Sequence, residues 1–183
     1  MTSIIKADRI QSTSNGFVLP PAGGIIQTQY SQKTDTATVS LSAQTYTALH
    51  SDLEVTITPV SANSVIKLEA QVFGEHGDAG NIYNSGVFFY RNTTRLGAPT
   101  AGNRFAVVGI LTRTYNVDNA DSTPEFAMFS FYDTPSTTSA ITYKVGMISW
   151  GAETFYINRT VDDQDLGYYE RGTSFISVTE IAG

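Results

Sequence analysis

Three aspartates close together form the segment best suited to ligand chemistry. Val161-Asp-Asp-Gln-Asp-Leu-Gly167 places Asp162, Asp163 and Asp165 in one short turn, and carboxylate oxygens are the donors that Ca²⁺ prefers. The spacing departs from the EF-hand loop, because no glycine stands at its sixth position and no glutamate closes its twelfth. A hydrated acidic loop explains the same pattern without a metal ion. We therefore expect no metal or cofactor, and keep these aspartates as the alternative calcium site.

Aromatic residues flank the acidic loop and favour a second kind of chemistry. Tyr156, Arg159, Tyr168 and Tyr169 combine rings that stack on the C–H faces of sugars with a charged group that binds hydroxyls. These four residues are the candidate glycan-binding set. Trp150 ends a strongly alternating stretch, so we expect its ring in the core or in a subunit interface.

Signatures of catalysis are missing from the sequence, which has no Gly-x-Ser-x-Gly, P-loop or His-Glu-x-x-His pattern. Gly74-Glu-His-Gly-Asp78 places a histidine between carboxylates, which can orient an imidazole. No nucleophile accompanies it, and a polar segment with flanking glycines is typical of a surface turn. A glycan-cleaving enzyme would need two carboxylates across a groove, and Glu153, Asp162 and Asp163 are the ones to examine. We predict that the protein is not an enzyme.

Composition narrows the remaining classes of function. The 183 residues carry 11 Lys and Arg against 17 Asp and Glu, a net charge of −6, and no cysteine. A nucleic-acid partner is not expected, because affinity for phosphate comes from clustered Lys and Arg. Disulfides are excluded, and no apolar run approaches the roughly 20 residues of a membrane span. Residues 1–20 contain Lys6, Asp8 and Arg9, so they do not match a signal peptide.

The elements that position these residues are predicted to be β-strands. Leu53, Val55 and Ile57 alternate with polar residues, and Pro59 ends the pattern. Residues 43–53 are expected to form a loop or a single turn, since no window sustains a helical period. Short strands separated by turn residues indicate an antiparallel β-sandwich. The expected strands are 25–31, 53–58, 65–73, 87–91, 106–113, 126–132, 141–150, 154–158 and 175–181.

Residues 1–24 differ from the rest of the chain, and 25–183 are expected to form the head domain. Pro20-Pro21 and Gly23-Gly24 mark the boundary. About 20 residues cannot fold alone, so the segment is either disordered or docked, and its isoleucines and Phe17 favour an extended arm that docks on another protein or subunit. The apolar residues expected to dock are Ile4, Ile5, Ile10, Phe17, Val18 and Leu19.

Large rings on both sides of some strands favour self-association. Phe88-Phe-Tyr90 carries rings on both faces of one strand, and Phe129, Phe131 and Tyr132 do the same on another. A strand that is apolar on both faces is buried on both, and a second copy of the chain is the simplest cover. The alternative is that these side chains wrap the sandwich edges or pack under loops.

Several short segments together resemble a known family. They include Ile5-Lys-Ala-Asp-Arg-Ile10 and Leu19-Pro-Pro-Ala-Gly-Gly-Ile-Ile-Gln27, followed by residues 53–59, 64–67, 133–143 and 170–182. In this order they are similar to fibre-like virion structural proteins of marine tailed bacteriophages, including cyanophages. The resemblance covers nearly the whole chain and implies an N-terminal arm that attaches to the particle. It also implies a jelly-roll head that is usually trimeric and binds glycans in some members.

The resulting hypothesis is a structural protein located in the virion, such as a short fibre, a spike or a capsid decoration protein. Its arm would contact other virion proteins, and its head would take part in host attachment through surface glycans. A stand-alone carbohydrate-binding module or secreted adhesin is the alternative. An enzyme such as a capsule depolymerase is the third option.

Overall fold

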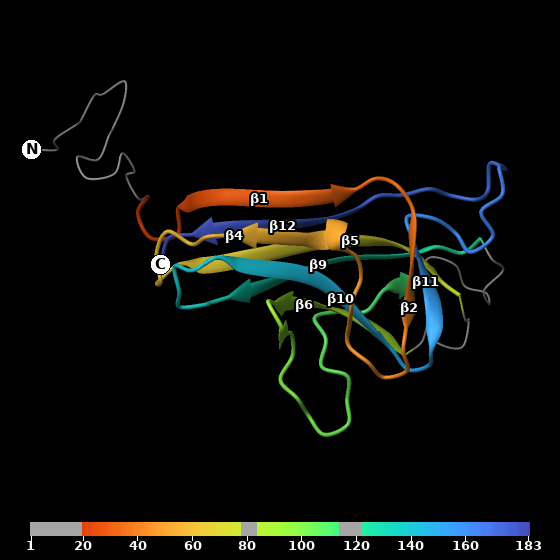
Figure 1. Ribbon diagram of the computed structural model, residues 1–183, viewed down its shortest axis with the longest axis horizontal. Helices are drawn as coiled ribbons and strands as arrows, with labels where there is room; N and C mark the ends of the chain where they lie inside the picture. The colour runs from red at the N-terminus through yellow and green to blue at the C-terminus, as the bar shows by residue number, and fades with distance from the viewer. Residues whose placement is uncertain (1–19, 78–83, 114–121) are drawn as a thin grey trace, which may run out of the picture.

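Two antiparallel β-sheets make up the protein, whose computed structural model describes residues 20–77, 84–113 and 122–183 (Figure 1). In the larger sheet are β1 (Ile25–Lys33), β2 (Ala37–Leu41), β5 (Val65–His76), β8 (Thr112–Arg113), β9 (Glu125–Asp133), β11 (Glu153–Ile157) and β12 (Ser174–Ile181). In the smaller sheet are β3 (Thr47–Ala48), β4 (Glu54–Ile57), β6 (Ser85–Arg91), β7 (Thr94–Leu96) and β10 (Ile141–Ser149). All described pairings are antiparallel.

The long strand β5 organises the larger sheet. One of its edges pairs first with β12 and then with β11, and β2 and β1 extend the sheet beyond these strands. The opposite edge pairs with β9 along nine residues, from Ile66 to Gly74. In the smaller sheet β10 is central, with β6 on one edge and β3 and β4 on the other.

The core forms where the two sheets face each other. Ile66, Leu68, Ala70 and Val72 alternate along β5 and are fully buried, and the register sets Val178 of β12 beside Leu68. Burial of apolar surface stabilises the fold by about 25 cal/mol per Å². The predicted antiparallel β-sandwich is confirmed, while its jelly-roll topology stays a prediction.

The predicted strand at 106–113 is too long. The structure has a strand only at Thr112–Arg113, and the preceding residues form a loop that lies along β6. Val108 N donates to Val87 O at 2.8 Å, and Val87 forms an isolated bridge with Gly109. The apolar residues of this segment therefore cover β6 instead of forming a ladder. The short strands β2, β3 and β7 were not predicted.

One turn, η1 (Ser51–Leu53), is the helical element among the described residues, which agrees with the loop or single turn expected at 43–53. No helix in these parts of the chain has the length and apolar character needed to cross a membrane.

Both faces of β6 are covered within a single chain. Phe89 belongs to the core, whereas Phe88, on the other face, packs edge-on against Tyr46 and Tyr90 with ring centroids 5.0 Å apart in both pairs. Gly146 of β10 makes room for this ring, because a Cβ there would lie 2.4 Å from Phe88 Cζ. The expectation that another copy covers β6 is wrong, and the packing of its rings under loops is the explanation.

The outer face of β9, unlike that of β6, is exposed. Phe129 points into the core, but Phe126, Met128 and Tyr132 point outward and are 37%, 65% and 59% exposed. Tyr30 of β1 lies on the same outer face, as the register through β12 and β5 shows. The larger sheet therefore carries apolar surface that its own chain leaves open.

Candidate functional site

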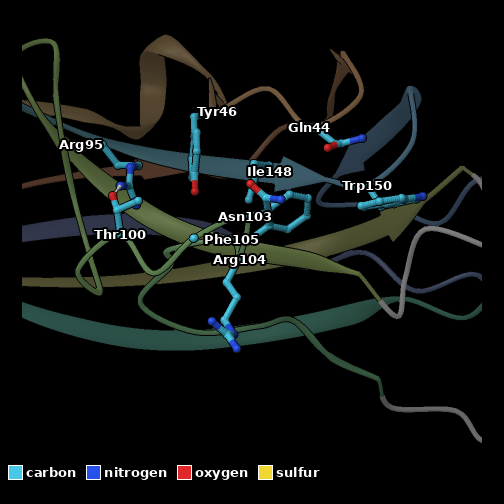
Figure 2. Close-up of a pocket in the computed structure, with 10 residues that line it drawn as sticks. Gln44, Tyr46, Arg95, Thr100, Asn103, Arg104, Phe105, Ile148 and Trp150 are labelled. Carbon is cyan, nitrogen blue, oxygen red and sulfur yellow. Dashed lines mark hydrogen bonds between the residues drawn. The ribbon is translucent and has the colours of Figure 1, made fainter.

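A hollow of about 430 Å³ lies between the loop that follows β7 and the end of β10 (Figure 2). We call it the Trp150 pocket, after its most prominent aromatic side chain. Its volume falls within the range of small-molecule sites. The lining residues are Gln44, Tyr46, Arg95, Thr100, Gly102, Asn103, Arg104, Phe105, Ile148 and Trp150.

Tyr46 forms a fixed wall of the Trp150 pocket. Its ring packs edge-on against the buried Phe88, and its carbonyl oxygen accepts a 2.8 Å hydrogen bond from Tyr90 Oη. Its hydroxyl accepts from Ala106 N at 2.9 Å. These contacts come from β6 and from the loop after β7, so the wall is set before any ligand arrives.

Arg95 of β7 lies flat against this wall. Its guanidinium carbon is 4.5 Å from the centroid of the Tyr46 ring, a cation–π arrangement. One of its nitrogens donates to Ala106 O, and another donates to Thr100 Oγ1 at 3.3 Å. The positive charge is thus held in one place by neutral groups.

Trp150 is 56% exposed and stands beside Phe105, with ring centroids 6.4 Å apart and planes inclined by 42°. Figure 2 shows Arg95, Tyr46, Phe105 and Trp150 following one another across the pocket, while the Arg104 side chain extends away from the row. A second hollow of about 320 Å³ shares four lining residues with the pocket: Asn103, Arg104, Phe105 and Trp150. The two hollows therefore meet at the exposed aromatic pair.

The charge balance at this place differs from that of the surrounding protein. Among the described residues, no carboxylate lines either hollow. Neither Arg95 nor Arg104 forms an ion pair with a carboxylate that the structure describes. Every other Lys or Arg with a described side chain forms such a pair: Lys33, Lys67, Arg91, Lys144, Arg159 and Arg171. In a chain of net charge −6, the two arginines that have no carboxylate partner among the described residues line one pocket.

The predicted glycan-binding residues form two separate pairs. The Arg159 guanidinium lies 4.4 Å above the Tyr156 ring, and the Tyr168 and Tyr169 centroids are 4.8 Å apart. Tyr168 is 60% exposed, whereas the Tyr169 hydroxyl donates to Asp162 at 3.2 Å. Their role in glycan binding stays a prediction.

A hollow of about 420 Å³, which we call the Asp163 hollow, lies beside Tyr169. Arg171 Nη2 lies 2.7 Å from Asp163, and Arg159 Nη1 lies 3.6 Å from the same carboxylate. The arginine charges are therefore balanced within this hollow. Its lining residues are Asp163, Gln164, Asp165, Leu166, Tyr169 and Arg171.

The alternative calcium site has no support in the described part of the chain, where no three His, Cys, Asp or Glu side chains gather as a metal site would need. Asp162 accepts from Gln164 at 2.6 Å and from Tyr169, and Asp163 is held by arginines. The carboxylates of Asp162 and Asp163 thus interact with neighbouring side chains.

The predicted surface turn at 74–78 is wrong, because β5 continues through His76 and buries both Glu75 and His76 completely. Glu75 accepts hydrogen bonds from Thr123 N and Oγ1, both at 2.8 Å, and from Val161 N at 2.7 Å. His76 Nδ1 lies 2.9 Å from Glu153 Oε1. Asp78 lies outside the described residues.

Glu125 of β9 completes this buried polar group. Its carboxylate accepts from His76 N at 3.1 Å. Burial raises the pKa of Glu125 to about 7, and the nearby Glu75 carboxylate acts in the same direction. Glu75 connects three chain segments. None of the residues of this buried group lines any of the three hollows described above. The cluster is therefore part of the framework.

The exposed Trp150 is the candidate site residue that sequence reasoning missed. It was expected in the core or in a subunit interface, and its 56% exposure excludes the core. The sequence did contain an indication that Trp150 is exposed, because its position alternates in phase with the polar residues Thr142 and Lys144. The six residues predicted to dock the arm, all before residue 20, lie outside the described residues.

Known proteins give the following comparisons. No protein-family model and no curated protein matches the sequence. Among solved structures, that of the infectious bursal disease virus Gt strain is similar, with a TM-score of 0.40, 12% identity, and coverage of 100% of this chain and 47% of that chain. The VP2 subviral particle of infectious bursal disease virus has a TM-score of 0.39 and 12% identity, and the match covers 99% of this chain and 46% of that chain. T=1 particles derived from infectious bursal virus have a TM-score of 0.39 and 14% identity, with coverage of 100% of this chain and 44% of that chain. The chain spans less than half the length of each of these chains.

Proposed function

We propose that the protein is a structural component of a virus particle. Residues 1–24 attach it to other virion proteins, and its β-sandwich head projects outward to contact the host surface. The resemblance to fibre-like proteins of marine tailed bacteriophages supports the attachment of the arm. A short fibre, a spike or a decoration protein is compatible with a head of this size.

The observation that carries this proposal is that the end of the arm and Trp150 lie at opposite ends of β10. Gly23 N donates to Ala182 O, so the last residues of the arm are fixed where β1 begins and β12 ends. β10 begins at the same end, where Ile141 pairs with Ile57. The strand has nine residues and is about 30 Å long, and Trp150 follows its far end. Attachment at one end therefore leaves Trp150 at the opposite end of β10.

Deletion of residues 1–20 tests the attachment. The shortened chain should stay folded and soluble, with a melting temperature close to that of the full chain, but should be missing from purified particles. A full chain carrying Tyr168→Ala is the matched control and should be incorporated normally. Normal incorporation of the shortened chain would end the anchoring role.

Self-association through the outer face of β9 belongs to the same proposal, with a trimer as the expected state. The exposed apolar residues Met128 and Tyr132 support it, since exposed apolar patches mark interaction surfaces. Light scattering should give the mass of a trimer, and Met128→Glu should shift the mass to that of one chain. A wild-type chain that is monomeric at all concentrations contradicts this part.

A stand-alone carbohydrate-binding module is the second candidate, and the Trp150 pocket is the observation that favours it. Such a module would be a monomer that binds sugar equally well without residues 1–20. The two candidates therefore differ in oligomeric state and in whether the chain is found in particles.

A further inference from the structure

We propose that the Trp150 pocket, together with the adjoining hollow, binds an acidic oligosaccharide. This inference deepens the proposed function, because it assigns the host-contact site and the chemical class of its ligand. The class follows from three features of the site, namely its exposed rings, its uncompensated charges and its extent.

The first feature is the exposed aromatic pair. Trp150 is 56% exposed and Phe105 is partly buried beside it, and the two ring planes form an open angle of 42°. Rings that offer an apolar face next to polar groups suit ligands with both C–H and hydroxyl surfaces. Gln44, Thr100 and Asn103 line the same pocket and supply amide and hydroxyl groups for sugar hydroxyls.

The second feature is the charge. Arg95 and Arg104 line the pocket and form no ion pair with any described carboxylate, whereas the other described Lys and Arg side chains do. Arginine binds carboxylate and sulfate groups through charge-assisted hydrogen bonds. A neutral sugar would leave both charges uncompensated, so the site favours an anionic one.

The third feature is the extent of the site. The hollows of about 430 and 320 Å³ share Phe105 and Trp150, and Arg104 lines both of them. Arg95 lies at the Tyr46 wall of the first hollow, whereas Asn84 and Ile110 line only the second. A ligand of several sugar rings can cross the aromatic pair and place an acidic group near each arginine.

The walls are fixed in advance, which favours measurable affinity. Tyr46 is held by Phe88, Tyr90 and Ala106, and Arg95 is held by Tyr46 and Ala106. Side chains that are already ordered lose little conformational entropy when a ligand binds. Arg104 has less support, a single 3.2 Å bond to Ala101 O from its side chain, and is the residue free to adjust to the ligand.

Isothermal titration of the full chain with three tetrasaccharides tests the proposal. One probe is carboxylated (tetragalacturonate), one is sulfated (a carrageenan tetrasaccharide), and one is neutral (maltotetraose). At least one acidic probe should bind ten times or more tighter than the neutral probe, and raising the salt concentration should weaken that binding. The preferred acidic probe separates a uronate from a sulfate ligand.

Variants locate the binding. Trp150→Ala should weaken acidic binding at least tenfold and Arg104→Gln about fivefold or more, with melting temperatures near that of the wild type. The matched controls, Leu166→Ala and Arg171→Gln at the Asp163 hollow, should bind like the wild type. The proposal is overturned if the wild-type chain binds neither acidic probe, if the neutral probe binds equally well, or if the controls lose binding while Trp150→Ala retains it.

The binding site and the virion role can fail independently. If the chain binds an acidic saccharide but is never found in particles, the virion role is wrong and the saccharide site stands. If the chain enters particles but binds no saccharide, the virion role stands and the saccharide site is wrong.

Discussion

The Trp150 pocket and the Asp163 hollow contain the same kinds of residue but differ in charge balance. Both combine tyrosine or tryptophan rings with arginine. At the Asp163 hollow Arg159 and Arg171 are paired with Asp163, whereas Arg95 and Arg104 have no described carboxylate partner. Residue types alone therefore do not identify a ligand site, and the distribution of counter-charges separates the two.

Phe88→Ala should have the largest effect. The ring is fully buried and supports Tyr46, so its loss should destabilise the protein by about 3–5 kcal/mol. Urea unfolding measures the change. Saccharide binding at the Trp150 pocket should fall, while Tyr168→Ala, an exposed ring at the other region, should cost less than about 0.5 kcal/mol. Equal costs for the two variants would contradict the different support of the two regions.

Glu75→Ala tests the framework behind the Asp163 hollow. The substitution leaves Thr123 N, Thr123 Oγ1 and Val161 N without their acceptor, and should cost about 2–3 kcal/mol. Hydrogen exchange should become faster at Val161 and stay unchanged at Ala106 behind the Trp150 pocket. Thr123→Val keeps the backbone bond and should cost about 1 kcal/mol. Faster exchange at both places would mean that the regions are not independent.

Glu125→Gln should change how stability depends on pH. Because burial raises the pKa of Glu125 from 4.5 to about 7, the folded state favours the protonated form, and stability falls as pH rises from about 4.5 to about 7. Glutamine removes this loss. The variant should be about 1–3 kcal/mol more stable than the wild type at pH 8 and no more stable at pH 4. Thermal unfolding at both values measures it, and a benefit of equal size at pH 4 would exclude ionisation as the cause.

The smallest effect is expected from the surface arginines. Arg171→Gln breaks an exposed ion pair with Asp163 and should cost less than about 1 kcal/mol, with a smaller cost at high salt. Arg104→Gln breaks no described ion pair, so salt should not change its effect on stability. Urea unfolding at low and high salt compares the two. A salt-dependent loss in Arg104→Gln would show that its charge is compensated after all.

Much of the fold follows from alternation along the sequence. The strands at 53–58, 65–73 and 126–132 were predicted because apolar residues repeat every second position, and buried apolar faces require that period. Residues 106–113 misled the prediction, because their apolar side chains pack as a loop over β6. Phe88, whose burial was attributed to a second copy, packs against Tyr46 and Tyr90 of its own chain. Local pattern does not show which segment covers a face.

The sites were less predictable because their residues come from separate segments. Glu75 is buried because Thr123 and Val161, far away in the sequence, supply its hydrogen-bond donors. In the Trp150 pocket Tyr46 comes from the segment between β2 and β3, Arg95 from β7 and Trp150 from the turn after β10. The acidic loop attracted attention because its aspartates are close together in sequence, yet the carboxylates of Asp162 and Asp163 interact with neighbouring side chains.

The bonds between Gly23, Gly24 and Ala182 have a mechanical consequence. Gly23 N and Gly24 O both bond to Ala182, and β1 continues antiparallel to β12 from there. A pull on residues 1–24 along the strand axis therefore loads this ladder in shear, so that many hydrogen bonds must stretch at once. A head tethered in this way would resist drag at its outer end better than one whose first strand could be peeled off bond by bond.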